Sequence, residues 1–284
     1  MNQSRRRKSR VVVALAAAGL AVPVMIRYPD VAVSFVVLFP LFGLLESRFA
    51  LRPQRIFRAG WACDAAHFFL NVLPGALLVA VLFATVGTML RGAVPSGLRV
   101  TIAAQPALVQ LVGTFLLSEL GMYWSHRIEH EVPFLWRFHA VHHSSPQLDW
   151  LSTQRTHPVD GAIRKLFIIP VFALGFSATW VAIYLVVYYF WSFLEHANMR
   201  VRFGPLRWII ASPHFHHWHH ADEPGAINKN YAPLLPVFDV LFGTCHLPPR
   251  RWPAAYGTPE PVPSGYVGQI GYPFRRREAV LDPS

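Results

Sequence analysis

Three clusters of histidine constrain the fold of this chain more than any other feature of its sequence. Ten of the 14 histidines lie in three short segments, HRIEH, HAVHH and HFHHWHH. Along the chain these segments supply His126 and His130; His139, His142 and His143; and His214, His216, His217, His219 and His220. A fold that uses the clusters together must bring distant parts of the chain to one place.

The spacing within each cluster is helical, because residues three and four positions apart lie on one face of a helix. Three sets share a face in this way: His126 with His130; His139 with His142 and His143; and His216 with His219 and His220. Two imidazoles on adjacent helical turns can hold one metal ion, as they do in HExxH motifs. Eight aligned imidazoles exceed the four ligands of a tetrahedral ion. The pattern therefore predicts two metal ions, each with four or five protein ligands and an open position for oxygen or substrate.

The composition predicts that the chain is embedded in a membrane. Hydrophobic residues make up 53% of it and charged residues 14%, which is too apolar for an ordinary soluble domain. Residues 1–284 are expected to form one membrane-embedded domain whose four transmembrane helices lie in the apolar runs 11–26, 31–45, 62–90 and 103–124. The first run also resembles the apolar part of a signal peptide, but the second run follows so closely that a helical hairpin fits better.

The net charge of +11 is distributed as in a membrane protein. Basic residues gather beside the apolar runs, at Arg5, Arg6, Arg7, Lys8 and Arg10; at Arg48, Arg52, Arg55 and Arg58; and at Arg250, Arg251, Arg275, Arg276 and Arg277. This pattern argues against nucleic-acid binding and predicts that the N-terminus and the histidine clusters lie on the cytosolic side. The two cysteines, Cys63 and Cys245, indicate neither a disulfide framework nor a thiolate metal site.

The apolar stretch 165–193 must return to the side from which it enters, because a single crossing would separate the last histidine cluster from the other two. We expect a re-entrant helical hairpin bent near Gly175. The expected fold is all-α: a polytopic membrane helical bundle with a cytosolic helical cap that carries the histidines. Its parts are an N-terminal hairpin and basic loop (1–60), a histidine-rich core (115–245) and a proline-rich, irregular and peripheral tail (247–284).

The three histidine segments, in this order and followed by NKNYAPLLPVFDVLFGT, resemble the fatty acid hydroxylase/sterol desaturase superfamily, whose pattern is HxxxH or HxxxxH, then HxxHH, then HxxHH. The resemblance covers roughly residues 115 to 245. It implies a non-haem di-iron centre on the cytosolic side of the membrane, with dioxygen as co-substrate. It also implies an external electron donor of the cytochrome b5 or ferredoxin type. Zinc can replace iron in preparations, since such nitrogen sites bind it well.

Further site residues follow from the resemblance. The family carries a ligand histidine, at times a pair, where this chain has His196; Ser192 and Arg200 stand four residues before and after it, so only one imidazole is present. His157, in STQRTHP, is either a further ligand or a donor to one. His217 and His214 are expected to surround the ligands or lie at the surface. Carboxylates beside the ligands either orient their distal ring nitrogens or are solvated at the surface; they are Glu129, Asp149, Glu195 and Asp222.

These features predict a membrane oxidoreductase that hydroxylates or desaturates a lipid, with a fatty acyl, alkyl or sterol-like substrate. An alternative is a metal-binding transporter or sensor without oxygen chemistry. A transporter should carry its ligands at mid-membrane, whereas these clusters lie at the ends of the apolar runs. A bis-histidine haem protein is disfavoured, because histidines one turn apart on one helix cannot reach opposite faces of a porphyrin. His67, inside the third run, is either functional or a hydrogen-bonded packing residue.

Overall fold

The fold is a bundle of membrane-length helices. The computed structural model describes residues 27–275, so the span predicted at 11–26 lies outside the described residues. Within 27–275 the chain forms helices and two isolated β-bridges but no strand. Four segments are long and apolar enough to cross a membrane: α2 (Pro29–Phe49), Val72–Ala93, α7 (Ala107–Glu131) and α11 (Ala178–His196). The predicted all-α, polytopic membrane bundle is confirmed.

The outer faces of these segments carry exposed apolar side chains. Val36 of α2, Leu108 of α7 and Val186 of α11 are 67%, 70% and 70% exposed. The segment Val72–Ala93 consists of α4 (Val72–Leu82), a π-helical turn (Phe83–Gly87) and α5 (Thr88–Ala93), and none of its residues is buried. Apolar surfaces of this extent suit contact with lipid chains, whereas water would disfavour them.

Pro133 separates α7 from the next helix and brings the first two histidine segments close together. Pro133 occupies the first position of α8 (Pro133–His143), and Val132 before it is extended. A residue before proline avoids the helical region, whereas proline itself fits a helix start. The chain therefore turns sharply after Glu131 and packs α8 against α7. This turn brings the HRIEH and HAVHH segments together.

The predicted bend near Gly175 is present. The chain leaves the histidines through α9 (Pro158–Leu166) and α10 (Ile169–Ala173), turns at Gly175 and returns along α11. Gly175 has a φ of +103°, and a Cβ atom there would lie 2.6 Å from the carbonyl oxygen of Arg99 in α6 (Ser96–Ala103). The second arm, α11, is longer than the short re-entrant helix that we expected. The reason is that the bend lies at the far end of the bundle, next to α6.

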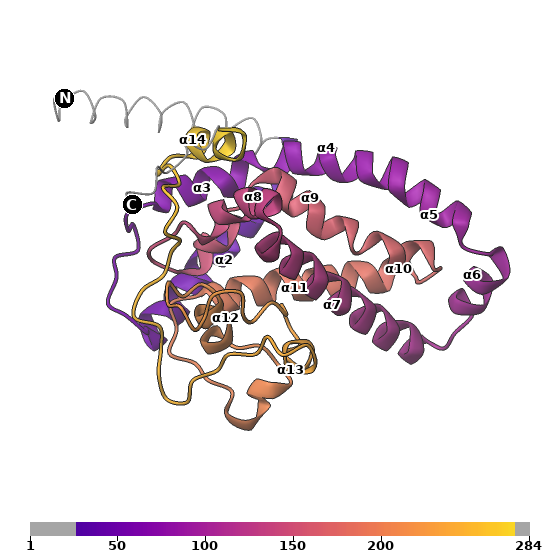
Figure 1. The fold of residues 1–284 in the computed structure, drawn as a ribbon. Coiled ribbons are helices and arrows are strands. Elements are labelled where there is room, and N and C mark those ends of the chain that lie inside the picture. Colours follow the sequence, from indigo (N-terminus) through magenta and orange to yellow (C-terminus); the bar gives the residue numbers. More distant parts are fainter. Residues whose placement is uncertain (1–26, 276–284) are drawn as a thin grey trace, which may run out of the picture.

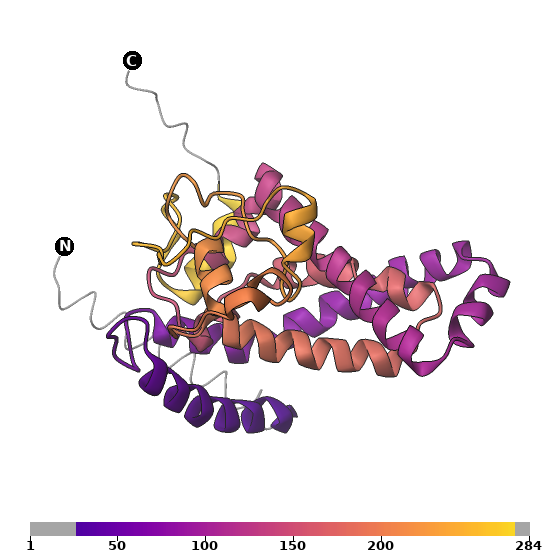
Figure 2. The same ribbon diagram turned by 90° about the horizontal axis from the view of Figure 1, so that it is seen from below.

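The bundle has two unlike ends (Figures 1 and 2). The α6 turn closes one end, while α3 (Trp61–Leu70), α8, α12 (Pro213–His219) and α13 (Val237–Leu241) gather at the other. Two 3₁₀ helices, Trp150–Gln154 and Gly204–Trp208, connect these elements. The long helices α7 and α11 run between the two ends, and both finish among the histidines.

The tail is largely irregular up to residue 275 but includes α14 (Tyr266–Gly271) and a short 3₁₀ helix (Tyr272–Phe274). Gln269 of α14 is fully buried, and its Oε1 accepts a hydrogen bond from Nε2 of His67 at 2.8 Å. Nδ1 of His67 lies 3.1 Å from the side-chain nitrogen of Asn71. Nε2 of His67 thus helps to pack α14 onto α3, while Nδ1 is satisfied by Asn71 at the end of α3.

A buried ion network fastens α3 to the loop after α8. Arg58 binds Asp64 at 2.7 Å and Asp149 at 2.6 Å, and Arg155 also binds Asp64. Asp149 in addition caps the 3₁₀ helix Trp150–Gln154 by accepting from the backbone of Ser152. Its carboxylate therefore holds two loops together and orients no histidine.

Candidate metal centre

Nine histidines form two groups, each compact enough to hold one metal ion. In each group the potential ligand nitrogens all lie within 4.8 Å of one another. The five-histidine group consists of His126, His130, His139, His143 and His219, and the four-histidine group of His142, His196, His216 and His220. Helices α8 and α12 contribute to both groups. The structure thus brings together nine of the ten histidines predicted as ligands.

The four-histidine group has the geometry of a coordination shell. Its Nε2 atoms face one another at 3.1 Å (His142 to His196), 3.0 Å (His196 to His216), 3.1 Å (His196 to His220) and 3.0 Å (His216 to His220). Nitrogens that each lie about 2.0–2.1 Å from one metal ion are separated by roughly 3 Å. The spacing therefore fits four nitrogens around one cation.

Backbone carbonyls decide which ring nitrogen is free to bind metal. In both groups an Nδ1 atom donates to a carbonyl oxygen: His126 to Tyr231 at 2.7 Å, His142 to Arg155 at 3.2 Å, His196 to Ser192 at 2.8 Å and His219 to Lys229 at 2.8 Å. A neutral imidazole that carries its proton on Nδ1 has a lone pair on Nε2. Lone pairs that face one another at about 3 Å repel, and a bound cation removes this repulsion.

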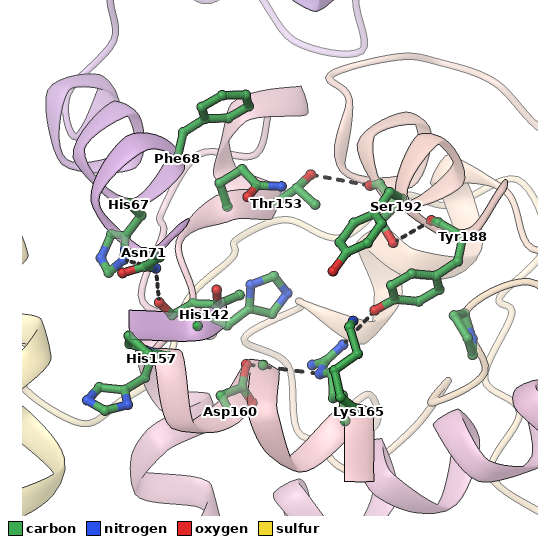
Figure 3. Close-up of a pocket in the computed structure, with 18 of the residues that line it drawn as sticks. His67, Phe68, Asn71, His142, Thr153, His157, Asp160, Lys165, Tyr188 and Ser192 are labelled. Carbon is green, nitrogen blue, oxygen red and sulfur yellow. Dashed lines mark hydrogen bonds and ion pairs between the residues drawn. The ribbon is translucent and has the colours of Figure 1, made fainter. Parts of the chain in front are cut away.

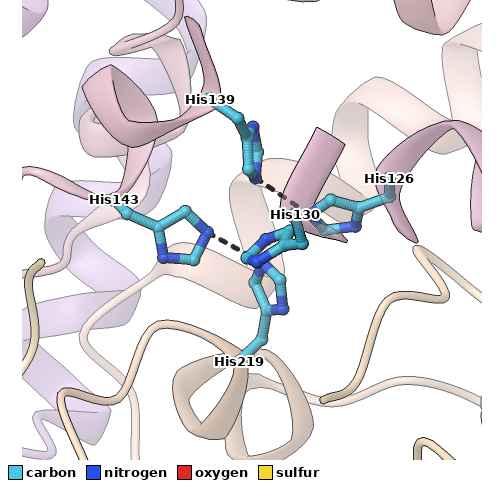
Figure 4. Close-up of side chains that lie close together, drawn as sticks. All are labelled: His126, His130, His139, His143 and His219. Carbon is cyan, nitrogen blue, oxygen red and sulfur yellow. Dashed lines mark hydrogen bonds between the residues drawn. The ribbon is translucent and has the colours of Figure 1, made fainter. Parts of the chain in front are cut away.

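The five-histidine group converges in the same way (Figure 4). Nε2 of His126 lies 3.1 Å from that of His139, and Nε2 of His143 lies 3.0 Å from that of His219. The Nε2 atom of His130 is buried and has no hydrogen-bond partner among residues 27–275. A buried ring nitrogen without a partner is unfavourable unless it binds something. The orphaned atom therefore fits a metal ligand.

Burial keeps these rings neutral. It lowers the pKa of His142, His143 and His219 well below the ordinary value, and neighbouring imidazoles add to the effect. Desolvation penalises the charged imidazolium, so the neutral ring predominates. The neutral ring is also the form that binds metal.

Among the carboxylates, Asp160 makes the most direct contact with a clustered histidine. Its Oδ1 lies 3.0 Å from Nδ1 of His139; burial alone would raise its pKa, but Arg164 and His139 outweigh burial and lower it. Predicted Glu129 lies behind this pair, 3.2 Å from the guanidinium of Arg164. Predicted Glu195 lies 3.9 Å from Nδ1 of His216, beyond hydrogen-bond distance. Asp160 was not among the residues predicted from the sequence, because no motif marks it.

Two predicted residues lie away from both groups. His157 is the N-cap of α9: its Nδ1 accepts from the backbone nitrogen of Val159, and its Nε2 donates to the carbonyl oxygen of Ile270. With both ring nitrogens engaged, it offers no lone pair to a metal. Asp222 is exposed and makes no hydrogen bond to a histidine within 27–275.

His217 and His214 belong to α12 and fasten it to neighbouring segments. Nδ1 of His217 bonds the hydroxyl of Tyr256 at 2.7 Å, and its Nε2 donates to the carbonyl oxygen of Ala197 at 3.1 Å. Because Ala197 follows His196, this bond fixes the end of α11 against α12. His214 donates to the carbonyl oxygen of Arg251 at 2.6 Å.

A cavity of about 430 Å³ opens beside both histidine groups. It is lined by His126 of the first group and by His142, His196 and His216 of the second. Figure 3 shows His67, Asn71 and His157 on one side of the cavity and Lys165, Tyr188 and Ser192 on the other. Its outer wall is apolar, formed by Phe68, Val72, Ala76 and Val79. The arrangement can hold an elongated apolar molecule next to two metal ions.

Residues 111–244 match the family described as fatty acid hydroxylase. An ornithine lipid hydroxylase, OlsE of Rhizobium tropici, is 36% identical over 176 residues, which are 61% of this chain and 52% of the relative. Alkylglycerol monooxygenases of Xenopus tropicalis and Homo sapiens are 34% and 32% identical over 151 residues, or 52% of this chain and 33% of each relative.

The chain spans about half the length of the ornithine lipid hydroxylase and about a third of each monooxygenase. No solved structure gives a significant match. All nine clustered histidines lie within the matched residues, so the resemblance and the metal geometry concern the same part of the chain. Residues 111–244 of this chain therefore resemble the fatty acid hydroxylase family in sequence and contain the residues of both histidine groups.

Proposed function

We propose that the chain is a membrane-bound di-iron oxidoreductase that uses dioxygen to hydroxylate or desaturate a lipid. The observation that carries this proposal is the pair of buried histidine groups beside a 430 Å³ cavity with an apolar wall. The names of the relatives, a lipid hydroxylase and monooxygenases of alkylglycerols, support a lipid substrate and oxygen chemistry. The substrate is an acyl, alkyl or sterol-like lipid.

Two iron ions held by the nine histidines would supply dioxygen activation. In hydroxylation, a C–H bond, dioxygen, two electrons and two protons give an alcohol and one water. In desaturation, two neighbouring C–H bonds with the same dioxygen, electrons and protons give an alkene and two waters. The electrons come from an external donor of the cytochrome b5 or ferredoxin type.

The protein's own contribution is binding, orientation and exclusion of water. The apolar wall of the cavity, with Phe68, Val72 and Val79, binds a hydrocarbon chain and keeps water from the reacting carbon. The backbone carbonyls that accept from Nδ1 hold each ring in one orientation. Imidazole rings fixed in this way would hold the metal ions next to the bound hydrocarbon chain.

The orientation we propose places the histidine end in the cytosol. Arg48 lies in the last turn of α2, and Arg52, Arg55 and Arg58 follow this helix at the same end. The opposite end carries Arg91 and Arg99. An excess of basic residues marks the cytosolic side of a membrane protein. Reductant and iron are also available there.

The test is turnover by the full chain in vesicles, with reductase, electron donor, isotopically labelled dioxygen and a panel of lipids, read by mass spectrometry. We expect one lipid class to gain a labelled oxygen atom or to lose two hydrogens. His142→Ala should abolish the conversion, whereas the matched variant His214→Ala, outside both groups, should retain it. Purified protein should carry about two metal ions per chain, one for each group. Conversion that survives His142→Ala would overturn the proposal.

A further inference from the structure

Lys165 lies in the cavity without an acidic partner. It belongs to α9 and lines the cavity together with Tyr188 and Tyr189 of α11. Its ammonium nitrogen is 4.8 Å from the ring centroid of Tyr189 and 5.6 Å from that of Tyr188. Within residues 27–275, no carboxylate oxygen lies within 4.0 Å of this nitrogen. Two tyrosine side chains hold this positive charge in place, and no carboxylate neutralises it within these residues.

The neighbouring cation, Arg164, differs from Lys165 because carboxylates lie close to it. The guanidinium of Arg164 lies 3.2 Å from a carboxylate oxygen of Glu129 and 4.0 Å from one of Asp160. Its charge is therefore balanced within the protein, next to the histidine ligands. Of the two adjacent cations in this wall, only Lys165 remains available to a ligand.

The surroundings make an unbalanced charge costly. Helix α9 packs against α7 and against α4, which is part of the segment Val72–Ala93; both α7 and this segment are long and apolar enough to cross a membrane. Ionisable groups that pack against membrane-length helices are unfavourable unless they are paired, and they often mark substrate pathways. An anionic group on a bound molecule would pair with the ammonium and remove this cost.

We propose that Lys165 binds the carboxylate or phosphate of an anionic lipid whose hydrocarbon part fills the cavity. This inference rests on the proposed function and specifies its substrate class. Tyr188 precedes His196 by eight residues on α11, which corresponds to roughly 12 Å along the helix. The carbon that reaches the metal ions therefore lies several bonds from the anionic group.

Binding of three lipids with identical chains tests the proposal directly: hexadecyl phosphate, palmitate and hexadecanol. The full, metal-loaded chain in neutral detergent is titrated with each lipid, and dissociation constants are obtained by native mass spectrometry. We expect both anions to bind at least about ten-fold more tightly than the alcohol, as for a charge-assisted hydrogen bond. A preference for only one anion would identify the head group that the site accepts.

Three variants test whether Lys165 is the residue that causes the preference for anionic lipids. Lys165→Met should abolish the preference for anions, and Lys165→Arg should retain most of it. Arg91→Met removes a cation near α6 and should change nothing, because Arg91 lies outside this cavity. A preference that survives Lys165→Met, or equal binding of all three lipids to the unmodified chain, would overturn the proposal. The comparison of the three lipids on the unmodified chain tests the proposal even if Lys165→Met does not fold.

The binding measurement separates this inference from the proposed function. It requires no turnover, so an intact anion preference in a chain that oxidises no lipid would leave the anion site standing and reject the oxidoreductase. Conversely, oxidation of neutral lipids without any anion preference would retain the oxidoreductase and reject the role of Lys165.

Discussion

The Asp160 carboxylate accepts a hydrogen bond from Nδ1 of His139 at 3.0 Å. Such a carboxylate fixes the ring and makes its other nitrogen a stronger ligand, and its loss commonly lowers metal affinity or activity about 10- to 100-fold. We therefore expect Asp160→Asn to weaken metal binding in the five-histidine group. Elemental analysis of the purified variant should give about one metal ion per chain where the unmodified chain gives about two.

Asp222→Asn is the matched control for this change. Asp222 stands close to the last histidine cluster in sequence, but its side chain is exposed and bonds no histidine within 27–275. The control should keep the full metal content. If the two variants lose metal equally, or if Asp160→Asn keeps both ions, the assigned role of Asp160 is wrong.

A second pair of variants separates a ligand from a helix cap. His196→Ala removes one of four nitrogens that converge within 3.0–3.1 Å, so the four-histidine group should lose its ion. His157→Ala removes the cap of α9 and should cost about 0.5–2 kcal/mol of stability while both ions remain. Metal analysis and thermal unfolding are measured on each variant. Metal loss in His157→Ala with the fold intact would restore His157 as a ligand.

The clustering of the histidines was predictable from the sequence, because helical spacing places His139, His142 and His143 on one face whatever the rest of the chain does. Their assignment to two groups was not, since it depends on how α8 packs against α7 and α12. The acceptors of the Nδ1 protons were also unpredictable, because most are backbone carbonyls, such as that of Tyr231, which leave no signature in the sequence.

At the scale of elements, the boundaries that deviate from expectation have local causes. The fourth predicted span, 103–124, continues as α7 to Glu131, because nothing interrupts the helix before Pro133. The third, 62–90, is split into α3 and α4 at Asn71. Much of the segment between the third and fourth predicted spans is also helical, because α5 continues to Ala93 and α6 begins at Ser96.

Gly175 offers a test of the hairpin that returns α11 to the histidines. Its φ is +103°, and the Arg99 carbonyl oxygen lies 2.6 Å from the position that a Cβ atom would occupy. Gly175→Ala should therefore destabilise the protein by about 1–3 kcal/mol. Gly92→Ala is the control, because a Cβ at this helical position meets nothing within 4 Å. Thermal unfolding in detergent should show a lower midpoint for Gly175→Ala alone, and equal midpoints would mean that the bend tolerates a side chain.

At the scale of the whole molecule, the two histidine groups lie at one end of the helical bundle, and the turn formed by α6 lies at the other (Figure 2). Composition and hydropathy predict this arrangement, because the ends of the apolar runs carry the histidines. The size and lining of the cavity were not predictable from the sequence, since they depend on the packing of α4, α9 and α11. The sidedness we propose follows from charge, with Arg48, Arg52, Arg55 and Arg58 at the histidine end.

Labelling of single cysteines in intact cells tests this sidedness. Cys63 and Cys245 are replaced by alanine, and one cysteine is introduced at Ser96, at the α6 end, or at Asp222, at the histidine end; both positions are exposed. A membrane-impermeant maleimide should label Ser96→Cys in intact cells and Asp222→Cys only after permeabilisation, because the basic residues keep the histidine end in the cytosol. Labelling of Asp222→Cys from outside would place the metal centre on the opposite face and exclude a cytosolic electron donor.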